Sequence, residues 1–303
     1  MSEAEEALEE FLRNRRTKNA PKALNRVLVA EALLDYAKFK ADKPARSQRI
    51  AYAMVHLLDF WQQATVSEIN RETLKAYELQ RKAARATVRR ELTCLRAALN
   101  HSVAMNRMVP FPRLELPEDG KPRQRWLTKH EVAKLIRAAR KEFRSRHWLV
   151  LFILVAVYTG ARKTAILELE WSQIDFVNRM LDFNQPNAEE TNKRRARIPL
   201  GPKLFGHLLR RHRRSNGPYV FHQKGDANTR IHSIDKGFRA ACIRAGLKHV
   251  TPHTLRHTRA SWFAQDGEKI LDVSEYMAVS TETLAKVYTH HNPKHLRALA
   301  ARL

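Results

Sequence analysis

Hydrophobic residues in the first third of the chain recur every three to four positions. This is the period of an α-helix that buries one face. The segments with this pattern are 23–40, 46–63 and 87–103. A shorter helix is predicted near 71–79. We therefore expect an all-helical domain over 21–109, preceded by a short tail over 1–20.

Prolines interrupt the helical pattern after residue 109. Four prolines and Gly120 lie within 109–122, which predicts an extended linker over 110–122. Thr128 is then followed three positions later by Glu131, the arrangement of a capping box at a helix start. We expect a helix from this point to about residue 141.

The longest apolar run spans the 11 residues 148–158. A bilayer-spanning helix needs roughly 20 residues, so this run predicts a buried helix that ends near Gly160. Short strands are predicted at 167–175, 180–183 and 195–200, with a hairpin turn over 184–194 and helices again from Lys203. The expected fold class is mainly α with a small antiparallel β-sheet (α+β), and the second domain spans 123–303.

The charge of the chain favours a polyanionic partner. Lys and Arg number 56 against 31 Asp and Glu, a formal net charge of +25. The excess lies mostly in 122–303, which holds 34 basic and 15 acidic residues. Double-stranded DNA is the leading candidate. A solvated basic surface and an anionic membrane remain as alternatives, but no basic amphipathic helix with a bulky aromatic face favours a membrane.

Composition also narrows the class of protein. The two cysteines, Cys94 and Cys242, lie far apart and form neither a disulfide framework nor a metal-binding pair. The acidic N-terminus has no apolar signal-peptide core. No Gly-rich phosphate loop and no acidic metal cluster is evident, so we expect no cofactor and no metal. A cytoplasmic, nucleoid-associated protein is the expectation.

Three segments carry candidate chemistry. Arg162 follows a buried helix and a glycine, where its planar guanidinium is well placed to bind a phosphate. His253 and Arg256 are three residues apart and share a face on a helix. Tyr288 lies near the C-terminus, ahead of His290. Taken singly, these residues are more typical of an ion pair, a helix cap, a packed ring and a surface histidine.

In their order and setting these segments resemble the tyrosine recombinases, or phage integrase family. Within the family the chain is most similar to integrases of prophages and genomic islands. The resemblance covers about the last 180 residues, and the helical domain resembles the family's core-binding domain more weakly. The motifs are Thr159-Gly160-Ala161-Arg162, Leu167-Glu168-Leu169-Glu170-Trp171 with Ile174-Asp175, Thr191 to Leu200, His253-Thr254-Leu255-Arg256 and Val287-Tyr288.

The resemblance implies a role for each catalytic candidate. Tyr288 would attack a DNA phosphodiester, form a 3′-phosphotyrosyl bond and release a 5′-hydroxyl. Arg162 and Arg256 would hold the non-bridging oxygens of the scissile phosphate. His253 would assist proton transfer, and Lys193 would protonate the leaving 5′-oxygen.

Elementary chemistry agrees with these roles. A phenol with a pKa of about 10 is a weak nucleophile at neutral pH, so we expect guanidinium neighbours that favour its anion. A lysine in an arginine-rich turn has a lowered pKa and can act as an acid. Lys163 and Arg194 compete with Lys193 for that role by charge, but they fit the register less well.

Two positions depart from the family pattern. Ala165 stands where the family often has an acidic residue. Val279 stands where the family usually has His or Trp, so one hydrogen-bond donor to the transition state is missing. Removing one such donor costs about 10²–10³-fold in rate. His290 is a possible accessory donor in its place, although surface exposure is its more common role.

The sequence also indicates which partners the protein binds. Candidate DNA contacts in the helical domain are Arg85, Arg89, Arg90 and Arg96, which a solvated helix face would also explain. The tail 292–303 is amphipathic. The resemblance implies that it docks into a neighbouring protomer to build a homotetramer on two synapsed sites; packing on its own domain is the alternative. An accessory DNA-bending or directionality factor is a further possible partner.

We therefore predict a site-specific recombinase that integrates or excises a mobile element. A Xer-type resolvase with the same active site is the first alternative. The second is a catalytically impaired DNA-binding relic of the family, which only Ala165 and Val279 favour.

Overall fold

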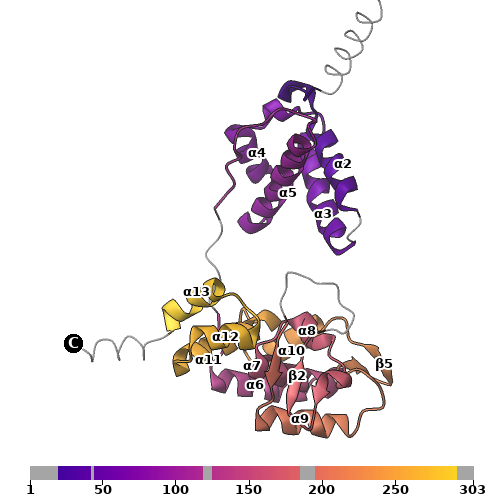
Figure 1. Cartoon of the computed structure of the whole chain (residues 1–303), viewed down its shortest axis with the longest axis vertical. Coiled ribbons are helices and arrows are strands. Elements are labelled where there is room, and N and C mark those ends of the chain that lie inside the picture. The colour runs from indigo at the N-terminus through magenta and orange to yellow at the C-terminus, as the bar shows by residue number, and fades with distance from the viewer. Residues whose placement is uncertain (1–19, 42–43, 119–124, 185–194, 292–303) are drawn as a thin grey trace, which may run out of the picture. The chain divides into compact units, whose positions relative to one another are not determined.

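The computed structural model describes residues 20–41, 44–118, 125–184 and 195–291, with the backbone alone at 44–47 and 289–291. The chain divides into two compact units, Met1–Pro122 and Arg123–Leu303 (Figure 1). Within the described ranges, no helix is both long and apolar enough to cross a membrane.

The first unit is all-helical in its described part, as predicted. Its core lies between α2, α3 and α5, where Leu33, Leu57 and Leu95 are fully buried. The aromatic rings of Trp61 and Tyr77 pack 4.8 Å apart beside this core. The helices are α2 (Val29–Lys40), α3 (Pro44–Trp61), α4 (Arg71–Arg81) and α5 (Arg85–Ala104), with 3-10 turns at Leu24–Arg26 and Val66–Glu68.

The first predicted helix begins later than expected. Residues 27 and 28 are extended instead of helical, and α2 starts at Val29. The carbonyl of Val27 accepts a hydrogen bond from Val66 N at 2.9 Å, and Leu28 forms a bridge with Thr65. A backbone contact to a distant segment therefore overrides the local helical pattern.

The proline-rich segment is extended but not free of the first unit. Leu114 is 6% exposed and belongs to the helical core. Glu115 lies 3.4 Å from the guanidinium of Arg71, and Arg89 donates a hydrogen bond to the carbonyl of Pro117. The described half of this segment is thus anchored along the helices.

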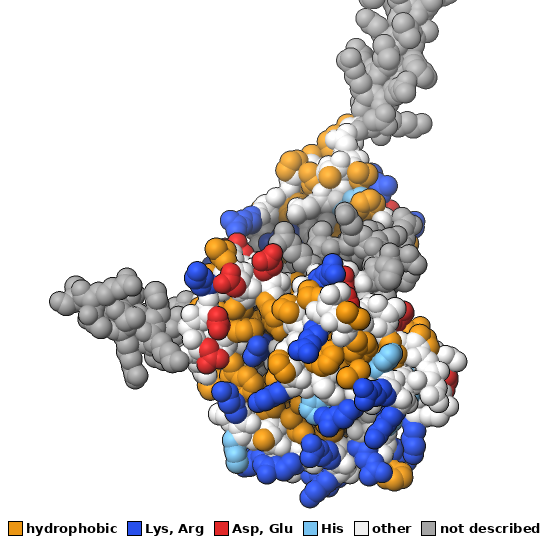
Figure 2. All heavy atoms as spheres, turned by 60° about the horizontal axis from the view of Figure 1, so that its bottom comes forward, with side chains coloured by type: hydrophobic (Ala, Val, Ile, Leu, Met, Phe, Trp, Pro, Cys, Tyr) orange, Lys and Arg blue, Asp and Glu red, His pale blue; other side chains and the backbone are white. Residues whose placement is uncertain are grey.

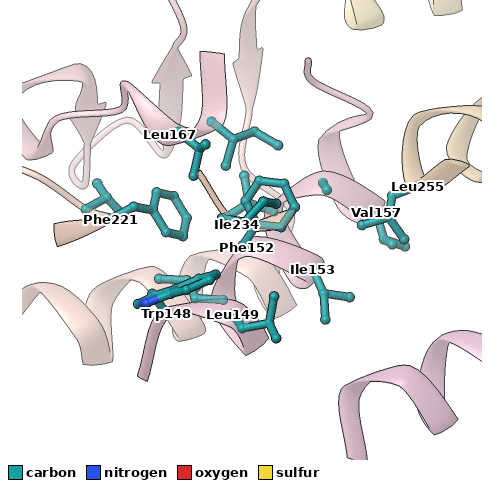
Figure 3. Packing of buried hydrophobic residues seen from close by; sticks show 14 of the residues in the cluster. Trp148, Leu149, Phe152, Ile153, Val157, Leu167, Phe221, Ile234 and Leu255 are labelled. Atoms are coloured by element: carbon teal, nitrogen blue, oxygen red, sulfur yellow. The ribbon is translucent and has the colours of Figure 1, made fainter. Parts of the chain in front are cut away.

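The second unit is built around α7, which is apolar on almost every face. Figure 3 shows Phe152 and Ile153 of α7 among side chains from the surrounding elements, including Leu167, Phe221 and Leu255. A helix surrounded in this way is buried on all sides, as the continuous apolar run predicts. The helices are α6 (Lys129–Arg140), α7 (Arg146–Thr159), α8 (Lys163–Leu167), α9 (Pro202–His212), α10 (Asp235–Arg244), α11 (Pro252–Asp266), α12 (Ile270–Met277) and α13 (Thr281–His291).

The capping box predicted at Thr128 is present. The Thr128 hydroxyl accepts from Glu131 N at 3.1 Å, and the Glu131 carboxylate accepts from Thr128 N at 2.8 Å. This start of α6 is tied to α11, because Leu127 N donates to the buried hydroxyl of Thr258 at 3.0 Å.

A three-stranded antiparallel sheet covers part of the core. Its order is β1-β2-β3, and Leu181 pairs with both Ile174 and Ile198. The strands are β1 (Ile174–Asp175), β2 (Met180–Asp182) and β3 (Arg197–Pro199). The fold class is therefore mainly α with a small antiparallel sheet, as predicted.

Two details of the strand prediction were wrong. The predicted strand 167–175 is not continuous: α8 ends at Leu167, a 3-10 turn follows at Trp171–Gln173, and only its last two residues belong to a strand, β1. A short apolar run does not distinguish a buried strand from a buried helix. A second hairpin, β4 (His222–Gln223) with β5 (Asp226–Arg230), lies where only helices were expected. Its residues are polar and show no clear alternation, so no pattern indicated it.

Gly160 ends α7 at a φ of 68°, and neighbouring side chains occupy the space that a Cβ at this position would need. A Cβ there would lie 2.6 Å from Cε of Met277 and 3.3 Å from Cγ of Arg259. Gly246 has the same φ of 68° with no atom within 4 Å of such a Cβ. Gly246→Ala is expected to cost about 1 kcal/mol for backbone strain alone. Gly160→Ala adds a packing clash and should cost about 1–3 kcal/mol more in urea unfolding. Equal losses of unfolding free energy in the two variants would show that the Met277 side chain moves aside without cost.

Candidate active site

Arg162 is held on a rigid turn between α7 and α8. Gly160 closes α7, and the hydroxyl of Thr159 donates to Val155 O at 2.7 Å and accepts from Ala161 N at 3.1 Å. Arg162 then occupies the N-cap position of α8 and is half-buried. The glycine and threonine of the motif therefore fix the direction in which the chain enters Arg162.

Arg256 connects three segments of the second unit. It lies on α11 and is 7% exposed. Its Nη1 donates to the carbonyl of Gly160 at 2.8 Å, and its Nη2 reaches the carbonyl of Ala278 at 3.4 Å. The end of α7, the body of α11 and the end of α12 therefore meet at one guanidinium, and Gly160 lies two residues from Arg162.

The structure brings Arg162, His253 and Arg256 into one electrostatic group. Burial, together with the charge of Arg162, lowers the pKa of Arg256 to about 10. Burial and the charge of Arg195 lower the pKa of Arg162. Burial lowers the pKa of His253 as well, with smaller contributions from His257, Arg256 and Arg162. Two guanidinium groups held close together stabilise a bound anion, and their planar forks match the oxygens of a phosphate or a carboxylate.

His257 is a site residue to which sequence reasoning assigned no role. Its ring lies 4.6 Å from that of His253 at an interplanar angle of 86°. Burial and the charge of Arg256 lower its pKa. The two histidines are four residues apart on α11, and this spacing was the signal that could have indicated the pair.

The lowered pKa values of His253 and His257 make stability depend on pH. Both rings stay neutral in the folded protein at pH values where free histidine, with a pKa of 6.5, binds a proton. The unfolded chain then binds more protons, so the free energy of unfolding should fall as pH drops below about 6.5. Urea unfolding near pH 7.5 and near pH 5.5 measures this loss. His257→Asn should reduce it, and an unchanged pH dependence would contradict the assignment.

Tyr288 does not have the environment that the sequence analysis predicted. Its pKa is raised to about 12, first by burial and then by the carboxylates of Glu268 and Asp272. The expectation that guanidinium neighbours favour its anion is therefore wrong for this state of the protein. The hydroxyl is buried without a hydrogen-bond partner among the described residues, and the ring packs beside Met277 and Leu284.

Both residues that depart from the family pattern make apolar contacts. Val279 packs on the same cluster of buried residues as Tyr288, while its backbone pairs with Ser274. Ala165 is 6% exposed and lies in the core around α7. Neither side chain donates a hydrogen bond, so each position contributes packing where the family pattern has a polar group.

Two predicted site residues lie outside what the structure describes. Lys193 falls in 185–194, and the side chain of His290 falls in 289–291. Arg194, one competitor of Lys193, is also outside. Lys163, the other competitor, is described and forms an ion pair with Asp235 at 3.2 Å.

The four arginines proposed for DNA contact on α5 differ in their surroundings. Arg85 lies 3.5 Å from Glu78, and Arg89 donates to the carbonyl of Pro117. Arg90 is exposed, and Arg96 is half-buried. No carboxylate among the described side chains lies within 4 Å of Arg90 or Arg96.

The part of the chain that carries Arg162, His253 and Arg256 matches a known protein family. The profile of the phage integrase family matches residues 125–295, more than half of the chain and the whole described site. The chain belongs to the phage integrase family.

Relatives in the family are distant in sequence. The integrase of Salmonella phage P22 is 28% identical over 231 residues, covering 71% of this chain and 56% of that protein. Tyrosine recombinase XerA of Pyrococcus furiosus is 27% identical over 194 residues, covering 63% of this chain and 65% of the relative. The chain therefore spans less than two thirds of the length of each.

Solved structures of the family share the fold. The Tn1549 transposon integrase in complex with transposon right end DNA superposes with a TM-score of 0.77, at 15% identity over 91% of this chain and 99% of the other. A lambda integrase dimer bound to a COC′ core site gives a TM-score of 0.72 at 19% identity, over 91% and 80% of the two chains. At these identities the likeness establishes the fold.

Proposed function

We propose that this chain is a site-specific DNA recombinase that cuts and rejoins DNA through a 3′-phosphotyrosyl intermediate. The observation that carries the proposal is the group of Arg162, His253 and Arg256, held together by the bonds of Arg256 to the segments after α7 and α12. Membership of the phage integrase family supports the same reaction class.

The proposed chemistry distributes the reaction over these residues. Arg162 and Arg256 hold the non-bridging oxygens of the scissile phosphate and stabilise the added negative charge of the transition state. Neutral His253 hydrogen-bonds the phosphate and helps to accept the phenolic proton of Tyr288. The Tyr288 oxygen forms a bond to phosphorus while the bond to the 5′-oxygen breaks. Lys193 gives that oxygen its proton.

The environment of Tyr288 indicates that attack requires a rearrangement. In the state described, burial and two carboxylates hold its hydroxyl protonated. We infer that the competent state brings this hydroxyl out of the cluster around Met277 and close to the two guanidinium groups. A pKa of about 12 in the free protein is a reason for low activity before DNA binds, and it is also the observation that favours an impaired relic as second candidate.

The partners of the chain belong to the same proposal. Duplex DNA is the substrate, and the Tn1549 transposon integrase, which shares the fold, is known in complex with transposon right end DNA. The first unit would contact the same duplex as a core-binding domain, with Arg85 and Arg90 as the exposed members of its four candidates. The proposal further includes a homotetramer on two synapsed sites that integrates or excises a mobile element. It also includes an accessory factor and a cytoplasmic, nucleoid-associated location.

A Xer-type resolvase is the alternative within the reaction class. Its support is the similarity to tyrosine recombinase XerA and to the XerD of Lacticaseibacillus casei, which is 26% identical over 150 residues. Genome context separates the two functions, because a gene beside a tRNA gene or phage genes favours integration.

Covalent trapping tests the proposal. The purified protein is incubated with nicked duplexes that carry the DNA junctions beside its own gene, and the products are run on a denaturing gel. A protein–DNA adduct with a free 5′-hydroxyl on the released strand is the expected result. Specific binding without any adduct would overturn the recombinase and favour the relic.

A further inference from the structure

A strongly basic surface lies on the second unit around α9. We call it the α9 face and define it by Arg140, Arg146, Arg210, Arg213, Arg214 and Lys224, all of which are exposed. Figure 2 shows Lys and Arg side chains gathered over the lower part of this unit, where acidic side chains are few. In Figure 1, α9 lies at the opposite end of the unit from α8, the helix that starts beside Arg162.

Two pairs of cations on this face each share a neighbouring ring. The charges of Arg210 on α9 and Arg140 on α6 both act on His207, so the two helices present their cations side by side. Nη2 of Arg211 lies 2.8 Å from Nε2 of His222 in β4. Lys224 and Arg146 both lie over the ring of Phe143, at 5.2 and 5.6 Å from its centroid.

Acidic residues do not neutralise the α9 face. Residues 201–250 hold 11 Lys and Arg but only Asp226 and Asp235 as acids, and Asp235 pairs with Lys163. Glu142 pairs with Arg244. None of the six defining cations has a carboxylate within 4 Å in the part of the chain that the structure describes. A surface of this kind is costly in self-repulsion unless a polyanion covers it.

Two buried donors beneath the face also lack acceptors. Nε of Arg211 and Nε2 of His147 are both buried, and neither has a hydrogen-bond partner among the described atoms. Arg211 is half-buried, and its guanidinium has a histidine as neighbour instead of a carboxylate. A partly desolvated guanidinium that has no carboxylate beside it is typical of a site that receives an anion from outside.

We propose that the α9 face binds the phosphate backbone of a second segment of duplex DNA, distinct from the segment held at the active site. The inference rests on the proposed function, which places the first duplex at Arg162 and Arg256. The cations are spread over the end of α6, the start of α7, the C-terminal end of α9 and the turn between β4 and β5. This spread fits a duplex, whose charges are repeated about every 1.7 Å. A peripheral membrane surface combines cations with a whole apolar face, whereas this face offers a single exposed aromatic ring among its described residues, Phe143, with two cations over it.

A two-duplex capture experiment tests the inference with the full chain. Protein is loaded on an immobilised duplex that carries the nicked junction sequence, free protein is washed away, and a labelled duplex of unrelated sequence is added. The test variant is Arg210→Gln with Arg213→Gln and Arg214→Gln. Its control carries Lys248→Gln, Lys269→Gln and Lys286→Gln, three exposed cations outside the α9 face, so the net charge of the two variants is equal.

Wild type and control should capture the second duplex, and the α9 variant should lose at least about tenfold in capture affinity. Each phosphate contact contributes about −0.9 to the slope of log affinity against log salt concentration. The α9 variant, which loses three cations, should therefore show a slope that is less negative by about 2.7. Its binding to the first duplex and its covalent adduct should match wild type. If no protein forms the adduct but capture of the second duplex still depends on the α9 cations, the recombinase reaction is contradicted. The proposed second DNA-binding surface is then still supported.

Two results would overturn the inference. Equal capture by wild type, control and α9 variant would show that the cations are merely solvated. Loss of binding to phosphatidylserine vesicles by the α9 variant, with DNA capture unchanged, would assign the face to a membrane. Matching thermal unfolding of the three proteins excludes misfolding as the cause of any difference.

Discussion

Tyr288→Phe is expected to abolish the covalent protein–DNA adduct while leaving DNA binding within a few fold of wild type. The substitution removes the oxygen that would bond to phosphorus and leaves the ring in place. The hydroxyl has no hydrogen-bond partner among the described residues, so its loss leaves no described group newly unpaired. Denaturing gels measure the adduct, and gel shifts with the same nicked duplex measure binding.

Tyr276→Phe is the matched control for this variant. Tyr276 packs against the same apolar cluster, and its hydroxyl reaches the carbonyl of Tyr158 at 3.4 Å. The Tyr276→Phe protein should lose some stability but still form the adduct. Adduct formation by the Tyr288→Phe protein would show that another residue is the nucleophile, and loss in both variants would point to damaged packing.

Arg256→Gln is expected to slow adduct formation by about 10²–10³-fold, the usual effect of removing one charged donor from a transition state. Its side chain also closes the site by donating to Gly160 O and Ala278 O. Leaving these buried carbonyls unpaired should cost about 1–3 kcal/mol of stability. Single-turnover adduct formation on the nicked duplex and urea unfolding measure the two effects separately.

Arg259→Gln separates catalysis from folding in this comparison. Arg259 is a half-buried neighbour on the same helix, and its guanidinium lies 3.9 Å from the centroid of the Phe263 ring. It should lose stability but slow adduct formation by less than about tenfold, since it packs on an aromatic ring. If both variants slow the reaction equally, the role of Arg256 is structural. Arg256→Lys keeps the charge without the planar fork and should fall between wild type and Arg256→Gln.

The sequence by itself determined much of the architecture. Apolar spacing predicted α3 and α5, helix-start signals predicted α4 and α6, and the continuous apolar run predicted the buried α7. These elements were predictable because their burial follows a single period, and because local signals such as Thr128 with Glu131 mark where a helix starts. The order of the motifs around Arg162, His253 and Tyr288 also indicated the family, which the profile match confirms.

Only the tertiary structure decided how the site is assembled. Residues 160, 256 and 278 meet because α7, α11 and α12 pack together, and no local pattern encodes hydrogen bonds between such distant segments. The extended start before α2 and the β4–β5 hairpin likewise depend on distant backbone partners. The pKa of Tyr288 departs furthest from expectation. Sequence predicted the chemistry of a phenol beside arginines, whereas burial and the carboxylates of Glu268 and Asp272 set its protonation, because desolvation and charge depend on distance in space.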